Sequence, residues 1–174
     1  NLSSEGDAGC YVDSDNDGWG DSAVGAPYTA GSDCNDTNAV EYPGNLFKEG
    51  NLGCYQDTDS DGWGDSAAAS PYTAGSDCND SAESIFPGNI PGEADPTGCY
   101  IDGDGDGWGD SSTGSQYDSG SDCDDGQLAV YPGNLSSEGD SGCYVDADND
   151  GWGDSTTGTQ YDPGTDCDDE QSAV

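Results

Sequence analysis

Acidic side chains dominate this sequence: 38 of the 174 residues are Asp or Glu, and Lys48 is the only basic residue. The formal net charge is -37, and hydrophobic residues make up only 30% of the chain. So few apolar residues cannot build one large core, which places the chain near the disordered or disulfide-rich classes. Nucleic acids and anionic membranes bind through Lys and Arg, so neither is an expected partner. The sequence predicts a cation as the partner, and it contains no apolar run long enough for a membrane span.

One unit occurs four times, with a period of 44 or 45 residues, which is typical of proteins built from small tandem repeats. Dividing the chain after each aromatic-Pro-Gly sequence gives repeats 1–44, 45–88, 89–133 and 134–174, the last of which lacks its final three residues. The first and last repeats open almost identically. We therefore expect the chain to be part of a longer array.

Eight cysteines recur in two sets, and each first cysteine is followed by a second one 24 residues later. In a chain with so small a core, this regularity favours disulfides and an extracellular location, secreted or at the cell surface. Pairing within a repeat, Cys10 with Cys34, is favoured. The alternative, Cys34 with Cys54, leaves Cys10 and Cys167 without a partner in the chain. The expected disulfide cysteines are Cys10, Cys34, Cys54, Cys78, Cys99, Cys123, Cys143 and Cys167.

Aspartates with the spacing of a calcium-binding loop recur in every repeat. The pattern D-x-D-x-D-G-W-G-D places them at loop positions 1, 3, 5 and 9, with a sharply turning Gly at position 6. The Trp at position 7 would offer its backbone carbonyl. Position 12, where an EF-hand has Glu, is Val24 in the first repeat, so a helix-loop-helix is not predicted. Another carboxylate must complete each site.

The two aspartates that flank the second cysteine of each repeat are the candidates for this role. Two carboxylates about 4 Å apart repel by about 4 kcal/mol at an effective dielectric of about 20, so six of them require a cation. Oxygen ligands without His favour Ca²⁺, with Mg²⁺ or Mn²⁺ as alternatives. The expected metal ligands are Asp13, Asp15, Asp17, Trp19, Asp21, Asp33 and Asp36; Asp57, Asp59, Asp61, Trp63, Asp65, Asp77 and Asp80; Asp102, Asp104, Asp106, Trp108, Asp110, Asp122 and Asp125; and Asp146, Asp148, Asp150, Trp152, Asp154, Asp166 and Asp169.

The aspartate loop, followed by G-S/T-D-C-N/D-D and Y-P-G, resembles the MopE-type metal-binding repeat family of bacterial surface proteins. More distantly, it is similar to the thrombospondin type-3 calcium-binding repeats. The resemblance covers about three quarters of each repeat. It implies that the matching aspartates bind metal and that the protein is extracellular and structural. An oxygen-only ligand set does not favour the copper associated with the family.

We expect small tandem repeats stapled by disulfides and calcium, built mostly of irregular loops. Short β-strands are predicted near Tyr11–Val12 and its equivalents, and a single helical turn at Asp36–Val40, which Pro43 would end. The aromatic residues are expected to form a miniature core in each repeat. In series, the repeats would form an elongated rod or fibre.

The favoured function is an extracellular structural protein, not an enzyme: a metal-rigidified stalk or filament. Its partners would be calcium ions and neighbouring repeats, or copies of itself. One alternative is an acidic matrix protein that buffers metal or nucleates mineral, and another is an adhesive module that binds carbohydrate or a partner through its aromatic side chains. Candidate N-glycosylation sites are Asn1, Asn35, Asn79 and Asn134.

Overall fold

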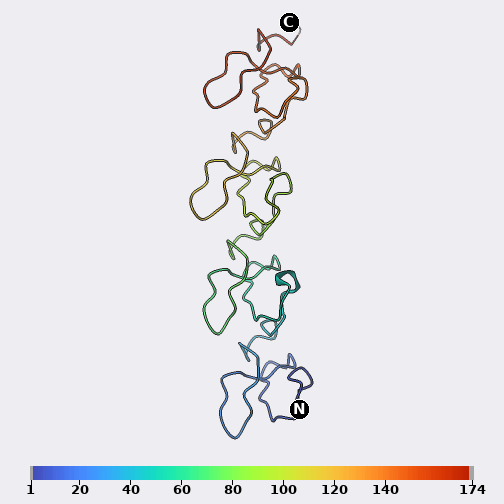
Figure 1. The fold of residues 1–174 in the computed structure, drawn as a ribbon, viewed down its shortest axis with the longest axis vertical. Coiled ribbons are helices and arrows are strands. Elements are labelled where there is room, and N and C mark those ends of the chain that lie inside the picture. The colour runs from blue at the N-terminus through green and yellow to red at the C-terminus, as the bar shows by residue number, and fades with distance from the viewer. Residues whose placement is uncertain (1, 173–174) are drawn as a thin grey trace. The chain divides into compact units, whose positions relative to one another are not determined.

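The computed structural model describes residues 2–172, and almost all of them are irregular. Within this part of the chain, the named elements consist of η1 alone, a 3₁₀ helix over Phe47–Glu49. Figure 1 accordingly shows every repeat as wide loops and tight turns. The chain divides into two compact units, Asn1–Pro87 and Gly88–Val174, each of which holds two repeats. No helix among the described residues has the length and apolar character needed to cross a membrane.

Backbone pairing in each repeat centres on one isolated parallel bridge. In the first repeat it joins Asp21 to Asp33: the amide of Gly31 donates to the Asp21 carbonyl, and the amide of Asp33 to the Gly20 carbonyl, both at 2.9 Å. Glycine is required at position 31, because a Cβ there would lie 2.0 Å from the Gly20 carbonyl oxygen. The bridge therefore holds the end of the aspartate loop against the aspartate that precedes the second cysteine. The equivalent bridges are Asp65 to Asp77, Asp110 to Asp122 and Asp154 to Asp166.

The short strands predicted near Tyr11–Val12 are wrong. The Val12 carbonyl accepts a hydrogen bond from the amide of Asp21 at 2.9 Å, and the Cys10 carbonyl accepts one from Thr29 at 2.8 Å. Because these two carbonyls accept hydrogen bonds from two different segments of the chain, the pairing does not extend into a β-ladder.

The helical turn predicted at Asp36–Val40 is also wrong. The segment forms a turn in which the amide of Asn38 donates to the carbonyl of Asn35 at 2.9 Å. Asp36 does not cap a helix, because both of its carboxylate oxygens accept hydrogen bonds from Ser14. The one described helix, η1, begins instead at Phe47, in the segment between the two cysteines of the disulfide.

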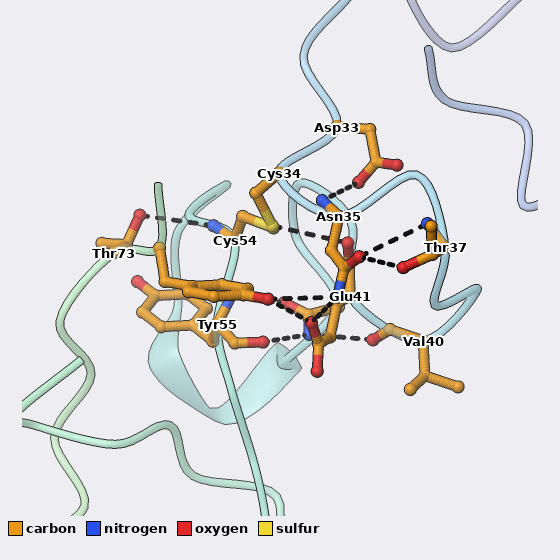
Figure 2. The surroundings of a disulfide bond; sticks show 11 residues. Asp33, Cys34, Asn35, Thr37, Val40, Glu41, Cys54, Tyr55 and Thr73 are labelled. Carbon is orange, nitrogen blue, oxygen red and sulfur yellow. Dashed lines mark hydrogen bonds between the residues drawn. A yellow bond between two sulfur atoms is a disulfide. The ribbon is translucent and has the colours of Figure 1, made fainter. Parts of the chain in front are cut away.

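The disulfides join consecutive repeats, so the favoured pairing within a repeat is wrong and the alternative is correct. Cys34 is bonded to Cys54 (Figure 2) and Cys123 to Cys143, with Cα atoms 6.4 and 6.5 Å apart. Cys78 and Cys99 are disulfide-bonded as well, whereas Cys10 and Cys167 are exposed free thiols. The backbone bridge already holds the two halves of each repeat together. The cysteines are therefore not needed for that purpose and can join neighbouring repeats.

The repeats within each unit also meet through a tyrosine. The hydroxyl of Tyr72, in the second repeat, donates to Oε2 of Glu41 at 2.7 Å and accepts from Nδ2 of Asn35 at 3.1 Å, both in the first repeat. In the second unit, the hydroxyl of Tyr161 likewise donates to the carboxylate of Asp124. Each pair of repeats is therefore tied by polar contacts beside its disulfide.

The tyrosine that follows the first cysteine supplies most of the aromatic core. Tyr55, Tyr100 and Tyr144 are only 1%, 4% and 4% exposed. Asn45 holds Tyr55 in place: its side chain donates to the Tyr55 carbonyl at 2.8 Å and accepts from the Tyr55 amide at 3.0 Å. The expected core is confirmed for these tyrosines, whereas Trp152 remains 44% exposed.

Candidate metal centre

The aspartate loops, residues 13–21, 57–65, 102–110 and 146–154, curl through left-handed backbone positions. In the first loop these are Asn16, with φ 66°, and Gly18, with φ 98°. An Asn or Gly adopts such values at low cost, and they turn alternate side chains toward the inside of the loop. The same two positions are left-handed in the other three loops, at Ser60, Gly62, Gly105, Gly107, Asn149 and Gly151.

Backbone amides within the loop fix one oxygen of each inward carboxylate. Oδ1 of Asp13 accepts from the amide of Asn16 at 2.8 Å, and Oδ1 of Asp15 accepts from the amide of Asp17 at 3.2 Å. Oδ1 of Asp17 accepts from the amide of Trp19 at 2.7 Å. These hydrogen bonds orient the carboxylates through Oδ1. Oδ2 of Asp15 and of Asp17, at positions 3 and 5, accepts no hydrogen bond.

Asp33 is completely buried, with 0% of its surface exposed, although it carries a carboxylate. Oδ1 accepts from the amide of Asn35 at 3.0 Å, but Oδ2 is buried without a hydrogen-bond partner. Its equivalents Asp77, Asp122 and Asp166 are 0%, 0% and 4% exposed, and Oδ2 of each is likewise unpaired. Burying an unpaired carboxylate oxygen is costly, and a bound cation removes that cost.

Three buried carboxylate oxygens without a hydrogen-bond partner, called unpaired oxygens below, occur in every repeat. In the first repeat, potential ligand atoms of Asp13, Asp15 and Asp17 lie within 4.8 Å of one another, and so do those of Asp15, Asp33 and Asp36. Asp15 belongs to both groups, so the loop and the segment around the second cysteine face one centre. The unpaired oxygens belong to Asp15, Asp17 and Asp33; Asp59, Asp61 and Asp77; Asp104, Asp106 and Asp122; and Asp148, Asp166 and Asp169.

The pKa values of the buried aspartates reflect this crowding of negative charge. Burial, opposed by the hydrogen bond from Asn35 and assisted by the negative charges of Asp17 and Asp15, raises the pKa of Asp33 to about 6. For the same reasons the pKa values of Asp77 and Asp122 are each about 6. A neighbouring cation would favour the charged form of all three carboxylates.

Asp36, which follows the second cysteine of the first repeat by two residues, also contacts the aspartate loop. Its Oδ1 accepts from the amide of Ser14 at 2.8 Å, and its Oδ2 accepts from the Ser14 hydroxyl at 2.6 Å. Asp80 makes the same two bonds to Thr58. Asp36 thus contacts the loop, and one of its oxygens lies within 4.8 Å of ligand atoms of Asp15 and Asp33, while metal ligation by this second aspartate stays a prediction.

Asp21 and Trp19, the other two predicted ligands of the first repeat, lie at the exit of the loop. Oδ1 of Asp21 accepts from the amide of Ala23 at 2.7 Å, while the Asp21 backbone forms the bridge to Asp33. The amide of Trp19 donates to Asp17, and its indole is partly exposed. The structure therefore gives both residues a part in shaping the loop.

A glutamate that the sequence analysis did not single out braces each site. Oε1 of Glu5 accepts from the amides of Gly20 and Ser32 at 2.8 and 2.9 Å, and Oε2 accepts from the Ser32 hydroxyl at 2.6 Å. Burial opposes the charged form of Glu5, but these hydrogen bonds outweigh it and lower its pKa. The recurrence of Glu five or six residues before the first cysteine was the available signal. The equivalent glutamates are Glu49, Glu93 and Glu138.

The sequon asparagines that the structure describes take part in the fold. Nδ2 of Asn35 and Nδ2 of Asn134 each donate two hydrogen bonds, and Oδ1 of Asn79 accepts one from Ser81. A glycan on Asn35 or Asn134 would replace one of the two amide hydrogens and so remove at least one of these bonds. Asn1 lies outside the described residues.

Three segments of the chain match the family model Cu-binding_MopE, which is described as a putative metal-binding motif: residues 33–46, 77–110 and 122–137. No curated protein and no solved structure matches the chain. Each matched segment begins at one of the fully buried aspartates, Asp33, Asp77 or Asp122, and the second one continues through the loop of the third repeat. The chain is thus a disulfide-bonded tandem-repeat protein that carries the MopE-type metal-binding motif in three matched copies.

Proposed function

We propose that each repeat binds Ca²⁺ between its aspartate loop and the aspartates that flank its second cysteine. The observation that carries this proposal is the set of three unpaired oxygens in every repeat. These oxygens are buried, they come from separate parts of the repeat, and hydrogen bonds to the opposite oxygen fix most of the carboxylates. A cation among them would compensate the burial of negative charge.

The donor set favours Ca²⁺ over copper. Every candidate side-chain ligand is a carboxylate, and the sequence contains neither His nor Met. Ca²⁺ takes about six to eight oxygen ligands in flexible geometry, whereas copper prefers nitrogen or sulfur. Of the sulfur atoms near the site, those of Cys34 and Cys54 are held in a disulfide. Mg²⁺ and Mn²⁺ remain the competing ions, because they also accept oxygen ligands.

The bound ions serve a structural role in an extracellular protein, not an enzymatic one. Four equivalent sites, one per repeat, favour a structural role. An enzyme would gain little from four identical buried sites. The disulfides and the tyrosine contacts then carry the rigidity of one repeat to the next. Such repeats in series would act as a stalk or as the segment of a filament, with neighbouring repeats as partners.

Calorimetric titration of the metal-free chain tests this function. We expect Ca²⁺ to bind with a definite stoichiometry of at least one ion per repeat, together with an increase in order by circular dichroism and a smaller hydrodynamic radius. Cu²⁺ and Zn²⁺, titrated in parallel, should not reproduce the ordering. Binding of many weak ions without ordering would instead indicate an acidic metal buffer. No Ca²⁺ binding at millimolar concentration would refute the proposal.

A further inference from the structure

The residue at loop position 2 differs among the repeats, and the structure gives this variation a consequence. Position 2 is Ser14, Thr58, Gly103 and Ala147 in the four repeats. In every repeat its backbone amide donates to the aspartate that follows the second cysteine by two residues. These bonds are 2.8 Å long to Asp36 and to Asp80, 2.6 Å to Asp125 and 3.0 Å to Asp169. The backbone contact is thus common to all four sites.

Only the first two repeats add a hydroxyl to this contact. The Ser14 hydroxyl donates to Oδ2 of Asp36 at 2.6 Å, and the Thr58 hydroxyl donates to Oδ2 of Asp80 at the same distance. Both oxygens of these carboxylates therefore accept hydrogen bonds. An ion that approaches Oδ2 must share it with the hydroxyl or displace the hydroxyl, which weakens the oxygen as a ligand.

In the last two repeats, the side chain at position 2 cannot make this bond. Ala147 has no hydroxyl, and Oδ1 of Asp169 is buried without a hydrogen-bond partner. Gly103 has no side chain, and Oδ2 of Asp125 lies only 2.5 Å from where its Cβ would be. The freed carboxylate thus occupies the space that a side chain fills in the other repeats. Asp122 and Asp166, which are 0% and 4% exposed, add one more buried, unpaired oxygen to each of these repeats.

We propose that loop position 2 sets the metal affinity of each repeat, so that the four sites form two classes. Repeats three and four, in which Asp125 and Asp169 keep one oxygen free of the position-2 side chain, bind the cation more tightly. Repeats one and two bind it more weakly, because a hydroxyl occupies the corresponding oxygen. This inference rests on the proposed function, since it presupposes that the aspartates hold a cation.

Calcium titration of the full metal-free chain and two variants tests the inference. The wild-type chain should show two classes of equal number, separated by about tenfold in affinity, as expected for one hydrogen bond to a charged group. The variant Ser14→Ala/Thr58→Ala should show a single tight class, because the backbone amide bond remains and the hydroxyl is gone. The variant Ala147→Ser should move one site from the tight class to the weak class.

A matched control removes another hydroxyl that, together with its own backbone amide, bonds to a carboxylate. The amide and the hydroxyl of Thr97 donate to Oδ1 of Asp95 at 2.9 and 2.8 Å, outside the aspartate clusters, so Thr97→Ala should leave the two classes unchanged. One uniform class in the wild-type chain, or weaker binding by Ser14→Ala/Thr58→Ala, would overturn the inference while leaving calcium binding intact. Failure of every site to bind Ca²⁺ would refute the proposed function itself.

Discussion

Asp21 and Asp33 are paired by an isolated parallel bridge. The segment between these two residues leads away from the aspartate loop and back to it. Through this one contact, the buried carboxylate of Asp33 faces the loop that carries Asp15 and Asp17. The bridge recurs in all four repeats, so the two halves of each candidate site are assembled by backbone hydrogen bonds. The side chains are then free to face a cation.

Neutralising the buried aspartate should have opposite effects with and without metal. We expect Asp33→Asn to melt at a higher temperature than the wild-type chain when both are metal-free, because it removes a buried negative charge. With Ca²⁺ the variant should melt lower and bind one ion fewer, since a ligand is lost. Thermal melts followed by circular dichroism, with the exposed-site variant Glu83→Gln as a control, check this. An equal loss of stability in both conditions would mean that Asp33 is structural only.

The metal-free chain should gain stability as the pH falls from 7 to 4. The pKa values of Asp33, Asp77 and Asp122 are about 6 in the folded chain, against an ordinary value of 3.8. A raised carboxyl pKa means that the folded state binds more protons, so this stabilisation is complete below the ordinary pKa and is lost as the pH rises through 6. Urea unfolding of dialysed, metal-free protein at several pH values measures the effect.

Saturating Ca²⁺ should reverse this dependence, because protons and the ion compete for the same carboxylates. The control is a chain with Asn in place of Asp33, Asp77 and Asp122, which should lose most of the pH dependence of the metal-free state. Greater stability of the metal-free wild-type chain at pH 7 than at pH 4 would contradict the burial of these charges.

Removing the bracing glutamate should loosen one repeat. Glu49 accepts hydrogen bonds from the amides of Gly64 and Ser76 and from the Ser76 hydroxyl. Replacing it with Ala should lower the free energy of unfolding by about 2 kcal/mol, since bonds to a charged acceptor are lost. Glu49→Gln, which keeps an acceptor oxygen, should cost less. Hydrogen exchange at Gly64 and Ser76 should accelerate in the Ala variant, and unchanged exchange there would contradict the contact.

Peptide mapping should recover a disulfide between Cys34 and Cys54, and another between Cys123 and Cys143. Cys10 and Cys167 should react with an alkylating reagent without prior reduction, because both are exposed thiols. Replacing Cys34 and Cys54 with Ser should lower stability by roughly 3 kcal/mol on chain-entropy grounds. A peptide that links Cys10 to Cys34 would contradict the observed connectivity.

The sequence predicted the aspartate loops because the loop residues are local: the spacing of Asp13, Asp15 and Asp17 suffices to bring their carboxylates together. It also identified Asp33 as a ligand candidate. It did not settle the disulfides, because cysteine spacing alone is compatible with either neighbour. The predicted helical turn failed because Asp36 bonds to Ser14, which is 22 residues away and invisible to local capping rules. Glu5 was missed for the same reason, since its partners lie 15 and 27 residues further on.

An anomalous difference map from crystals grown with Ca²⁺ would locate the bound ions themselves. We expect one strong peak in each repeat, within about 2.3–2.6 Å of carboxylate oxygens from both the loop and the buried aspartate, such as Asp15 and Asp33. Repeats whose aspartates are well ordered and show no anomalous peak between these carboxylates would contradict this expectation.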